Sequence, residues 1–222
     1  MQNDVLKIRL VSLLQKYSCI RCKALIFSFA LCLLTVSAKA QAYTILVWGD
    51  SLSAAYGIPA EQGWVALLGE RLAGRNIQVV NRSISGETTY NGNARMPQSL
   101  ADINPDLLIL ELGANDGLRG LDLGLMRQNL ATIIQLAHDN DAEVLLLGMK
   151  IPPNYGRTYA DSFHAIYLDL AAQYHIALVP FFLEPVVLNH DFMQHDGFHP
   201  TAAAQAEILD HVWPVLSALL PN

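Results

Sequence analysis

Cysteine is scarce in this chain, and all of it lies near the amino terminus. The 222 residues include three cysteines, Cys19, Cys22 and Cys32. A fold built from the rest of the chain therefore has no disulfide, no thiolate metal site and no cysteine nucleophile. Cys19 and Cys22 have C-x-x-C spacing, but there is no second pair, and the amino-terminal segment that holds them has the pattern of a targeting sequence. We therefore interpret the spacing as chance.

Basic residues are also scarce once the first 42 residues are set aside. That segment holds six of the 14 lysines and arginines and one of the 20 acidic residues, so the remainder has 8 basic and 19 acidic residues and a formal net charge of −11. Such an acidic chain is a poor match for nucleic acid or an anionic membrane surface. We therefore expect neither as a partner.

The first 42 residues have the three regions of a secretory signal peptide. A basic start is followed by an apolar run over residues 24–36, interrupted only by Ser28 and Thr35. Small-residue cleavage patterns follow at residues 38–40 and 40–42. We predict a signal peptide over residues 1–42, a mature domain over residues 43–222, a periplasmic location and no membrane anchor after cleavage.

Three alternatives stay open for this segment. An uncleaved anchor typically needs about 20 apolar residues, more than the run offers. Lipidation of Cys32 needs a small residue just before it, whereas Leu31 stands there. The long basic start also leaves open a start codon further downstream.

Apolar runs and amphipathic segments alternate along the rest of the chain. The expected strands cover residues 44–48, 77–80, 107–112, 144–149 and 176–182. The expected helices cover residues 64–72, 88–103, 123–138, 159–174 and 201–220. Gly92 and Pro97 interrupt the second helix, Thr201 is the expected N-cap of the last, and Pro214 should kink it.

The strands are apolar almost throughout, and helices separate them. This pattern predicts a parallel sheet covered on both faces. Glu111 is the one polar residue in the strand over residues 107–112. We see no internal repeat or linker, and we expect a single α/β domain with a three-layer α/β/α, flavodoxin-like fold and a five-stranded parallel sheet.

The first strand ends in a polar turn. Apolar residues 45–48 lead directly into Gly49, Asp50 and Ser51. A serine at the carboxyl end of such a strand lies where open α/β sheets bind ligands. The turn lacks the G-x-S-x-G pattern, which excludes the nucleophile elbow of the α/β-hydrolases. A plainer interpretation is that Asp50 and Ser51 cap the next helix.

Three later stretches favour a catalytic interpretation: residues 83–86, 113–116 and 196–199. Together with the Gly-Asp-Ser turn they resemble the blocks of the SGNH (GDSL) hydrolase superfamily, because Ser51, Gly86, Asn115 and His199 occur in the family's order. Residues 49–57, 113–120 and 153–157 resemble in particular its bacterial periplasmic thioesterase/lysophospholipase and arylesterase branch. The resemblance also implies the flavodoxin-like fold.

The expected topology gathers these residues at one edge of the sheet. Ser51, Gly86 and Asn115 follow the first three strands, while Asp196 and His199 lie between the fifth strand and the last helix. A serine hydroxyl needs a base to become a nucleophile. We predict His199 as that base and Asp196 as the group that orients its imidazole, as in the family.

Plainer interpretations exist for both residues, and there are rivals. Asp196 can be a turn residue before Gly197, and His199 can simply enter the helix that follows. His195, His190 and Asp191 are alternative partners, and a metal site of His195, Asp196 and His199 is conceivable. No comparable cluster supports it, so we expect no metal and no cofactor. The remaining histidines are expected on the surface or in structural roles: His138, His164, His175 and His211.

The resemblance implies an oxyanion hole built from the backbone N–H groups of Ser51 and Gly86 and the side-chain amide of Asn115. Gly86 suits a place where the backbone approaches a ligand closely. A plain tight turn explains Gly86 equally well, and Asn115 can be a turn former. We expect Asp50 and Asp116 to organise hydrogen bonds rather than to take part in catalysis.

Specificity should come from the loops. Ile151, Tyr155 and Leu118 are expected to line an apolar groove for an acyl chain. We predict a monomeric, secreted serine esterase that hydrolyses acyl esters and thioesters, including lipid substrates. The alternatives are a carbohydrate O-acetylesterase of the same superfamily and, from another class, a non-catalytic periplasmic lipid-binding protein.

Overall fold

The computed structural model describes residues 42–221, so the predicted signal peptide lies outside the described residues apart from Ala42. Five strands form one parallel sheet in the order β2-β1-β3-β4-β5. The strands are β1 (Tyr43–Gly49), β2 (Ile77–Asn81), β3 (Leu107–Glu111), β4 (Glu143–Leu147) and β5 (Ala177–Val179). This order confirms the predicted flavodoxin-like fold.

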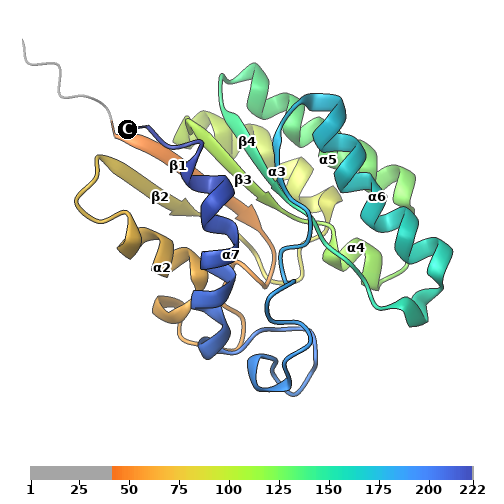
Figure 1. Ribbon diagram of the computed structural model, residues 1–222. Helices are drawn as coiled ribbons and strands as arrows, with labels where there is room; N and C mark the ends of the chain where they lie inside the picture. Colours follow the sequence, from red (N-terminus) through yellow and green to blue (C-terminus); the bar gives the residue numbers. More distant parts are fainter. Residues whose placement is uncertain (1–41, 222) are drawn as a thin grey trace, which may run out of the picture. The chain divides into compact units, whose positions relative to one another are not determined.

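Helices cover both faces of this sheet (Figure 1). On one face, α2 (Trp64–Arg71) and α7 (Gln205–Ser217) pack against each other. The other face carries α3 (Thr89–Ile103), α5 (Leu123–Asp139) and α6 (Arg157–Tyr174). A short helix, α4 (Ala114–Leu118), directly follows β3. Four 3₁₀ turns complete the described structure: Ala60–Gln62, Pro153–Tyr155, His190–Phe192 and Ala202–Ala204.

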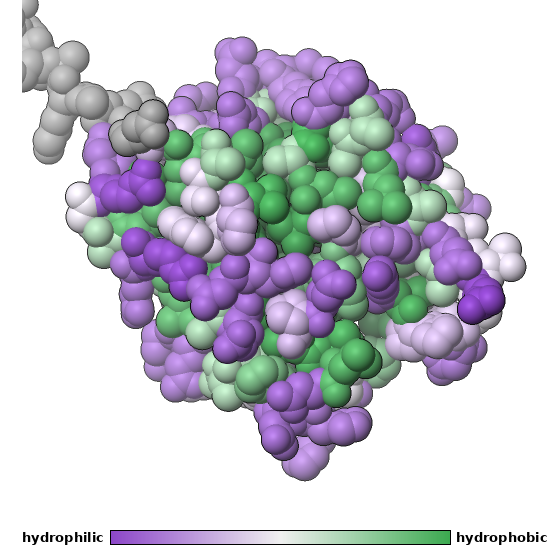
Figure 2. All heavy atoms as spheres, viewed as in Figure 1, coloured by the Kyte–Doolittle hydropathy of each residue, from purple (hydrophilic) through white to green (hydrophobic). Residues whose placement is uncertain are grey.

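The two central strands explain the continuous apolar runs of the sequence. Residues 45–48 in β1 and 107–110 in β3 are completely buried because helices cover them on both sides. The outer surface is mixed: Figure 2 shows hydrophobic and hydrophilic residues side by side on the face with α2 and α7. Between residues 42 and 221, no helix is long and apolar enough to cross a membrane.

Two expected elements depart most from their predicted bounds. β5 ends at Val179, because Pro180 follows and proline has no N–H to extend the ladder. The last helix begins at Gln205, not at Thr201. The Thr201 side chain does not cap it but donates to the backbone carbonyl of Asp191 (3.2 Å).

The predicted interruption of the second helix is wrong. α3 runs without a break through Gly92 and Pro97 after an N-cap at Thr88, whose side chain accepts from the Asn91 N–H. Gly92 is there for packing, since a Cβ at this position would lie 2.4 Å from the Leu112 side chain. The close approach of the helix to the sheet therefore outweighs the poor helix propensity of glycine.

Candidate active site

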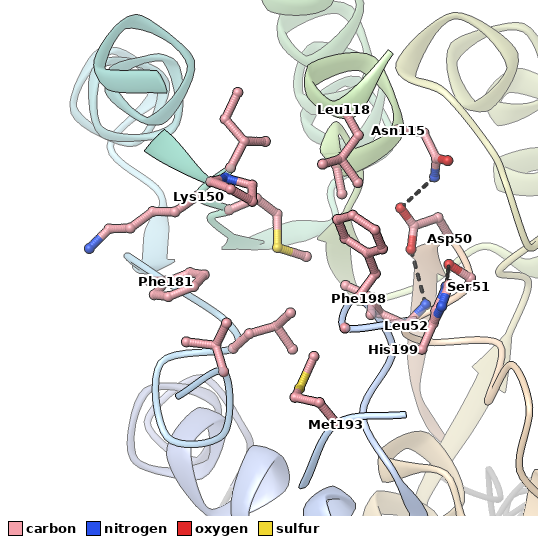
Figure 3. A pocket seen from close by; sticks show the side chains of 17 residues that line it. Asp50, Ser51, Leu52, Asn115, Leu118, Lys150, Phe181, Met193, Phe198 and His199 are labelled. Atoms are coloured by element: carbon pink, nitrogen blue, oxygen red, sulfur yellow. Dashed lines mark hydrogen bonds between the residues drawn. The ribbon is translucent and has the colours of Figure 1, made fainter. Parts of the chain in front are cut away.

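The carboxyl ends of the strands bring the predicted site residues together. Ser51 follows β1, Gly86 follows β2, and Asn115 lies in α4 directly after β3. His199 lies in the loop between β5 and α7. Figure 3 shows Ser51, Asn115 and His199 around Asp50 at this edge of the sheet. The convergence that the sequence predicted is therefore present.

Ser51, His199 and Asp196 form one chain of hydrogen bonds. The Nε2 atom of His199 lies 2.8 Å from Ser51 Oγ. Its Nδ1 atom lies 2.7 Å from Asp196 Oδ2. A neutral imidazole that donates from Nδ1 to the carboxylate presents an unprotonated Nε2 to the serine hydroxyl. The geometry therefore suits proton transfer from Ser51 to His199.

A tight turn holds Asp196 in the ionised form. Its Oδ1 atom accepts from the backbone N–H groups of Phe198 (2.9 Å) and His199 (3.0 Å). Partial burial opposes ionisation, but these two N–H groups and the His199 side chain outweigh it and lower the pKa of Asp196 to about 2. Asp196 is therefore negatively charged throughout the neutral range and can stabilise a protonated His199.

Tyr56 is a neighbour of His199 to which the sequence assigned no role. The centroids of the two rings lie 4.5 Å apart, with their planes inclined by 41°. The backbone carbonyl of Tyr56 accepts from the Gln194 side chain (2.8 Å), which ties this segment to the loop of His199. Tyr56 therefore limits the movement of the imidazole on one side.

The predicted oxyanion donors each keep an N–H hydrogen available for a ligand. Among the described residues, the backbone N–H groups of Ser51 and Gly86 donate to no other group. Gly86 has φ +78° and lies in a turn closed by the Glu87 N–H and the Ile84 carbonyl (3.1 Å). A positive φ at this turn position is why glycine is found there. Asn115 donates one amide hydrogen to Asp50 Oδ2 (2.9 Å), which leaves the other free.

Two buried carboxyl groups lie beneath the Ser51 turn. Asp50 accepts from the Leu52 N–H (3.0 Å) in addition to Asn115. Glu111 Oε2 accepts from the Asp50 N–H (3.2 Å) and the Ser53 hydroxyl (2.8 Å). Burial raises the pKa of Asp50 to about 6 although its hydrogen bonds oppose this. Burial and the neighbouring Asp50 raise the pKa of Glu111 well above its usual range.

The sequence assigned no role to Glu111, although this residue stands out as the one polar residue of its strand. A carboxyl group in an otherwise apolar, central strand is costly to bury and needs a reason to be there. The reason is its register: Glu111 pairs with Gly49, so its side chain reaches the turn that follows β1. Asp116 is placed as expected, since it accepts from the Thr89 N–H (2.9 Å) and hydroxyl (2.6 Å).

An apolar cavity of about 210 Å³ opens beside Ser51 and His199. Figure 3 shows Leu118, Phe181, Met193 and Phe198 around this space. Ile151 also lines it, as expected. Tyr155 does not, because the chain leaves the cavity after Pro152 and the 3₁₀ turn Pro153–Tyr155 exposes 39% of this residue. The expectation for Tyr155 is therefore wrong.

The other histidines with a described contact do not bond Ser51, Asp196 or His199. His190 and His195 line a second hollow together with Tyr56 and Asp196, and it shares Met193 and Gly197 with the apolar cavity. His164 and His211 lie 3.0 Å from the carbonyls of Met149 and Phe181, and so hold two segments of the cavity wall. In the described part of the chain, no group of three or more His, Cys, Asp or Glu residues is arranged to hold a metal ion.

The sequence and the structure both match known proteins. Residues 47–207 match the GDSL-like Lipase/Acylhydrolase family, and the chain belongs to this family. Over 200 residues it is 50% identical to Esterase TesA of Pseudomonas aeruginosa, covering 89% of this chain and 100% of that protein. Over 190 residues it is 44% identical to Thioesterase 1/protease 1/lysophospholipase L1 of Escherichia coli K12, covering 86% of this chain and 90% of that protein.

A solved structure agrees with this assignment. The crystal structure of the psychrotrophic esterase EstA from Pseudoalteromonas, inhibited by monoethylphosphonate, matches with a TM-score of 0.77 and 36% sequence identity. The match covers 81% of this chain and 100% of that chain. The predicted superfamily is thus confirmed, and the chain is an ester and thioester hydrolase of the SGNH type.

Proposed function

We propose that Ser51 is the nucleophile of this hydrolase, with His199 as its general base and Asp196 as the orienting carboxylate. The observation that carries the proposal is the Ser51–His199–Asp196 hydrogen-bond chain at the mouth of an apolar cavity. Ser51 Oγ attacks the acyl carbonyl while its proton moves to His199 Nε2. The protonated His199 then gives this proton to the leaving alcohol or thiol, and an acyl-enzyme remains.

Water completes the cycle. His199 takes a proton from a water molecule, which attacks the acyl-enzyme carbonyl, and the proton returns to Ser51 as the acid leaves. Both steps pass through a tetrahedral oxyanion. We assign its stabilisation to the N–H groups of Ser51 and Gly86 and the free amide hydrogen of Asn115. Removal of one such donor typically lowers kcat by about 10²–10³.

The cavity favours acyl groups longer than acetyl. Its wall carries Leu118, Ile151, Phe181 and Phe198, and apolar side chains stabilise a bound hydrocarbon chain by burying it. An acetyl group would leave most of the 210 Å³ empty. Lipid and other acyl esters and thioesters are therefore better substrates than the O-acetyl groups of carbohydrates.

We further propose that the enzyme acts in the periplasm as a monomer. The basic and apolar segment over residues 1–42 supports export. Every group of the proposed mechanism comes from one chain, so activity needs no second copy. Sedimentation of the mature protein at assay concentration tests the oligomeric state.

Hydrolysis of p-nitrophenyl esters from acetyl to palmitoyl tests the substrate class. The mature chain should turn over medium-length esters faster than acetyl, and Ser51→Ala should be inactive with unchanged thermal unfolding. A steep loss of activity beyond acetyl would favour the carbohydrate O-acetylesterase. Binding of fatty acids by the wild-type chain without turnover of any ester would favour the lipid-binding alternative.

A further inference from the structure

A single arginine connects the two loops that carry the proposed oxyanion donors. Arg119 directly follows α4, four residues after Asn115, so both side chains lie on the same face of the helical turn. Its Nη2 atom donates to Asn115 Oδ1 (3.1 Å) and to the backbone carbonyl of Gly86 (3.0 Å). The guanidinium thus links the segment after β3 to the segment after β2.

The contacts with Arg119 and Asp50 together determine which way the Asn115 amide points. A guanidinium can only donate hydrogen bonds, and an ionised carboxylate can only accept them. Asn115 lies between one of each, so its oxygen faces Arg119. Its nitrogen faces Asp50 (Figure 3). The opposite orientation would place the amide NH₂ against the guanidinium. Arg119 therefore keeps the donating end of the amide on the side of Ser51.

The contact with Gly86 fixes a flexible point of the neighbouring loop. Glycine has the widest backbone freedom of any residue, so Gly86 needs outside contacts to hold its N–H in one direction. Arg95 holds the same segment at two other points, because it bonds the Glu87 side chain (2.8 Å) and the carbonyl of Arg82 (3.2 Å). Arg119 holds the carbonyl of Gly86 itself.

We propose that Arg119 is a positioning residue of the oxyanion hole, which sets the amide of Asn115 and the backbone of Gly86 before the substrate binds. The inference rests on the proposed function. Arg119 acts through these two residues and donates to no reacting atom. Preorganised donors are effective because they need no reorganisation during the reaction. The loss of Arg119 should therefore slow the chemical steps and leave substrate binding unchanged.

The test compares Arg119→Met and Arg119→Lys with wild type on two substrates, a neutral p-nitrophenyl ester and an anionic acyl-CoA. In Arg119→Met, kcat should fall about 10-fold on both substrates, while KM stays unchanged. This is a smaller loss than the factor of about 10²–10³ expected when an oxyanion donor itself is removed. Arg119→Lys should be intermediate, because one ammonium cannot reproduce the planar guanidinium. Arg127→Met is the matched control, since this half-buried arginine of α5 bonds Asp169 and Gln173 and neither of the two residues that Arg119 bonds.

A double mutant separates positioning from general stabilisation. If Arg119 acts through Asn115, then Arg119→Met should lower kcat by a clearly smaller factor in an Asn115→Ala background than in wild type. The same factor in both backgrounds would show that Arg119 does not act through Asn115. If Arg119→Met does not unfold cooperatively, it is not properly folded and its kcat is not informative. Arg119→Lys then decides, because a reduced kcat in this variant supports the inference and a wild-type kcat overturns it.

Three further results would overturn the inference, each in a distinguishable way. A wild-type kcat in folded Arg119→Met, with Ser51→Ala inactive, would overturn the role of Arg119 alone. A rise in KM confined to acyl-CoA would show that Arg119 contacts the substrate instead. Turnover by Ser51→Ala would overturn the proposed function and this inference with it.

Discussion

Glu111 offers the sharpest test of how the Ser51 turn is held. Its Oε2 atom accepts from the Asp50 N–H and the Ser53 hydroxyl, while its Oε1 atom has no partner among the described residues. The side chain is completely buried and its neighbour Asp50 is also acidic. We therefore expect Glu111 to be protonated at neutral pH, with the proton on Oε1.

Two substitutions separate the shape of this group from its charge. Glu111→Ala leaves two buried donors without an acceptor, at about 1–3 kcal/mol each, so unfolding free energy should fall by about 2–6 kcal/mol before any cavity is counted. That is a large part of the about 5–15 kcal/mol of a typical domain. Glu111→Gln keeps an oxygen for both donors, so it should change the unfolding free energy by less than about 1 kcal/mol.

The pH dependence gives a second readout. A raised pKa in the folded state means that Glu111 stabilises the fold below its ordinary pKa of 4.5, and that this contribution is lost as the pH rises through the folded-state value. Glu111→Gln removes this loss, so its stability relative to wild type should increase with pH. Asp50 interacts with Glu111, so its own titration changes with the substitution and contributes to the same difference.

Urea unfolding at mildly acidic and mildly alkaline pH measures both effects. Glu70→Gln is the matched control, because Glu70 is an exposed glutamate of α2. If Glu111→Gln destabilises the protein as much as Glu111→Ala, the buried group is ionised and the reasoning fails. A parallel assay of ester hydrolysis should show Glu111→Gln active and any folded Glu111→Ala impaired.

Three further substitutions test the site and its surroundings. Gly113→Ala should cost more than about 2 kcal/mol, because φ is +115° and the new Cβ would lie 2.3 Å from the Tyr167 hydroxyl; a wild-type urea midpoint would contradict this. Asp196→Asn should lower kcat on the order of 10⁴-fold because His199 loses its orienting partner, and near-normal turnover would argue against the assigned role. In the same variant the unfolding free energy should fall less steeply as the solution is acidified. Ionised Asp196 stabilises the wild-type fold above pH 3.8, and this contribution is lost as the pH falls through its folded-state pKa of about 2. Leu118→Trp should shift the preferred ester to shorter chains by filling the cavity, and an unchanged preference would place the acyl chain elsewhere.

The fold could be predicted because its main signal is local. Buried parallel strands need continuous apolar runs, and these are visible in the sequence. α4 was not expected, because Asn115, Asp116 and Gly117 are typical turn residues. The structure starts a helix there from Gly113, whose positive φ turns the chain as it leaves β3. The close packing of Gly92 was also hidden, since it depends on Leu112 in another element.

The site could be predicted in part for the same reason. Residue types and topology together placed Ser51, Asn115 and His199 at one edge of the sheet. The sequence assigned no role to Tyr56, Glu111 and Arg119, because their contacts cross from one loop or strand to another. Their partners could be known only once the strand register and loop conformations were seen.

The proposed mechanism is tested most directly by covalent labelling of Ser51. The wild-type chain, treated with an alkylphosphonate ester, should gain one phosphonyl group, found on the peptide with Ser51 by mass spectrometry. Ester hydrolysis should fall in proportion to labelling, and His199→Ala should label far more slowly. Labelling at another residue, or full activity in a chain labelled at Ser51, would contradict the assignment of Ser51 as the nucleophile.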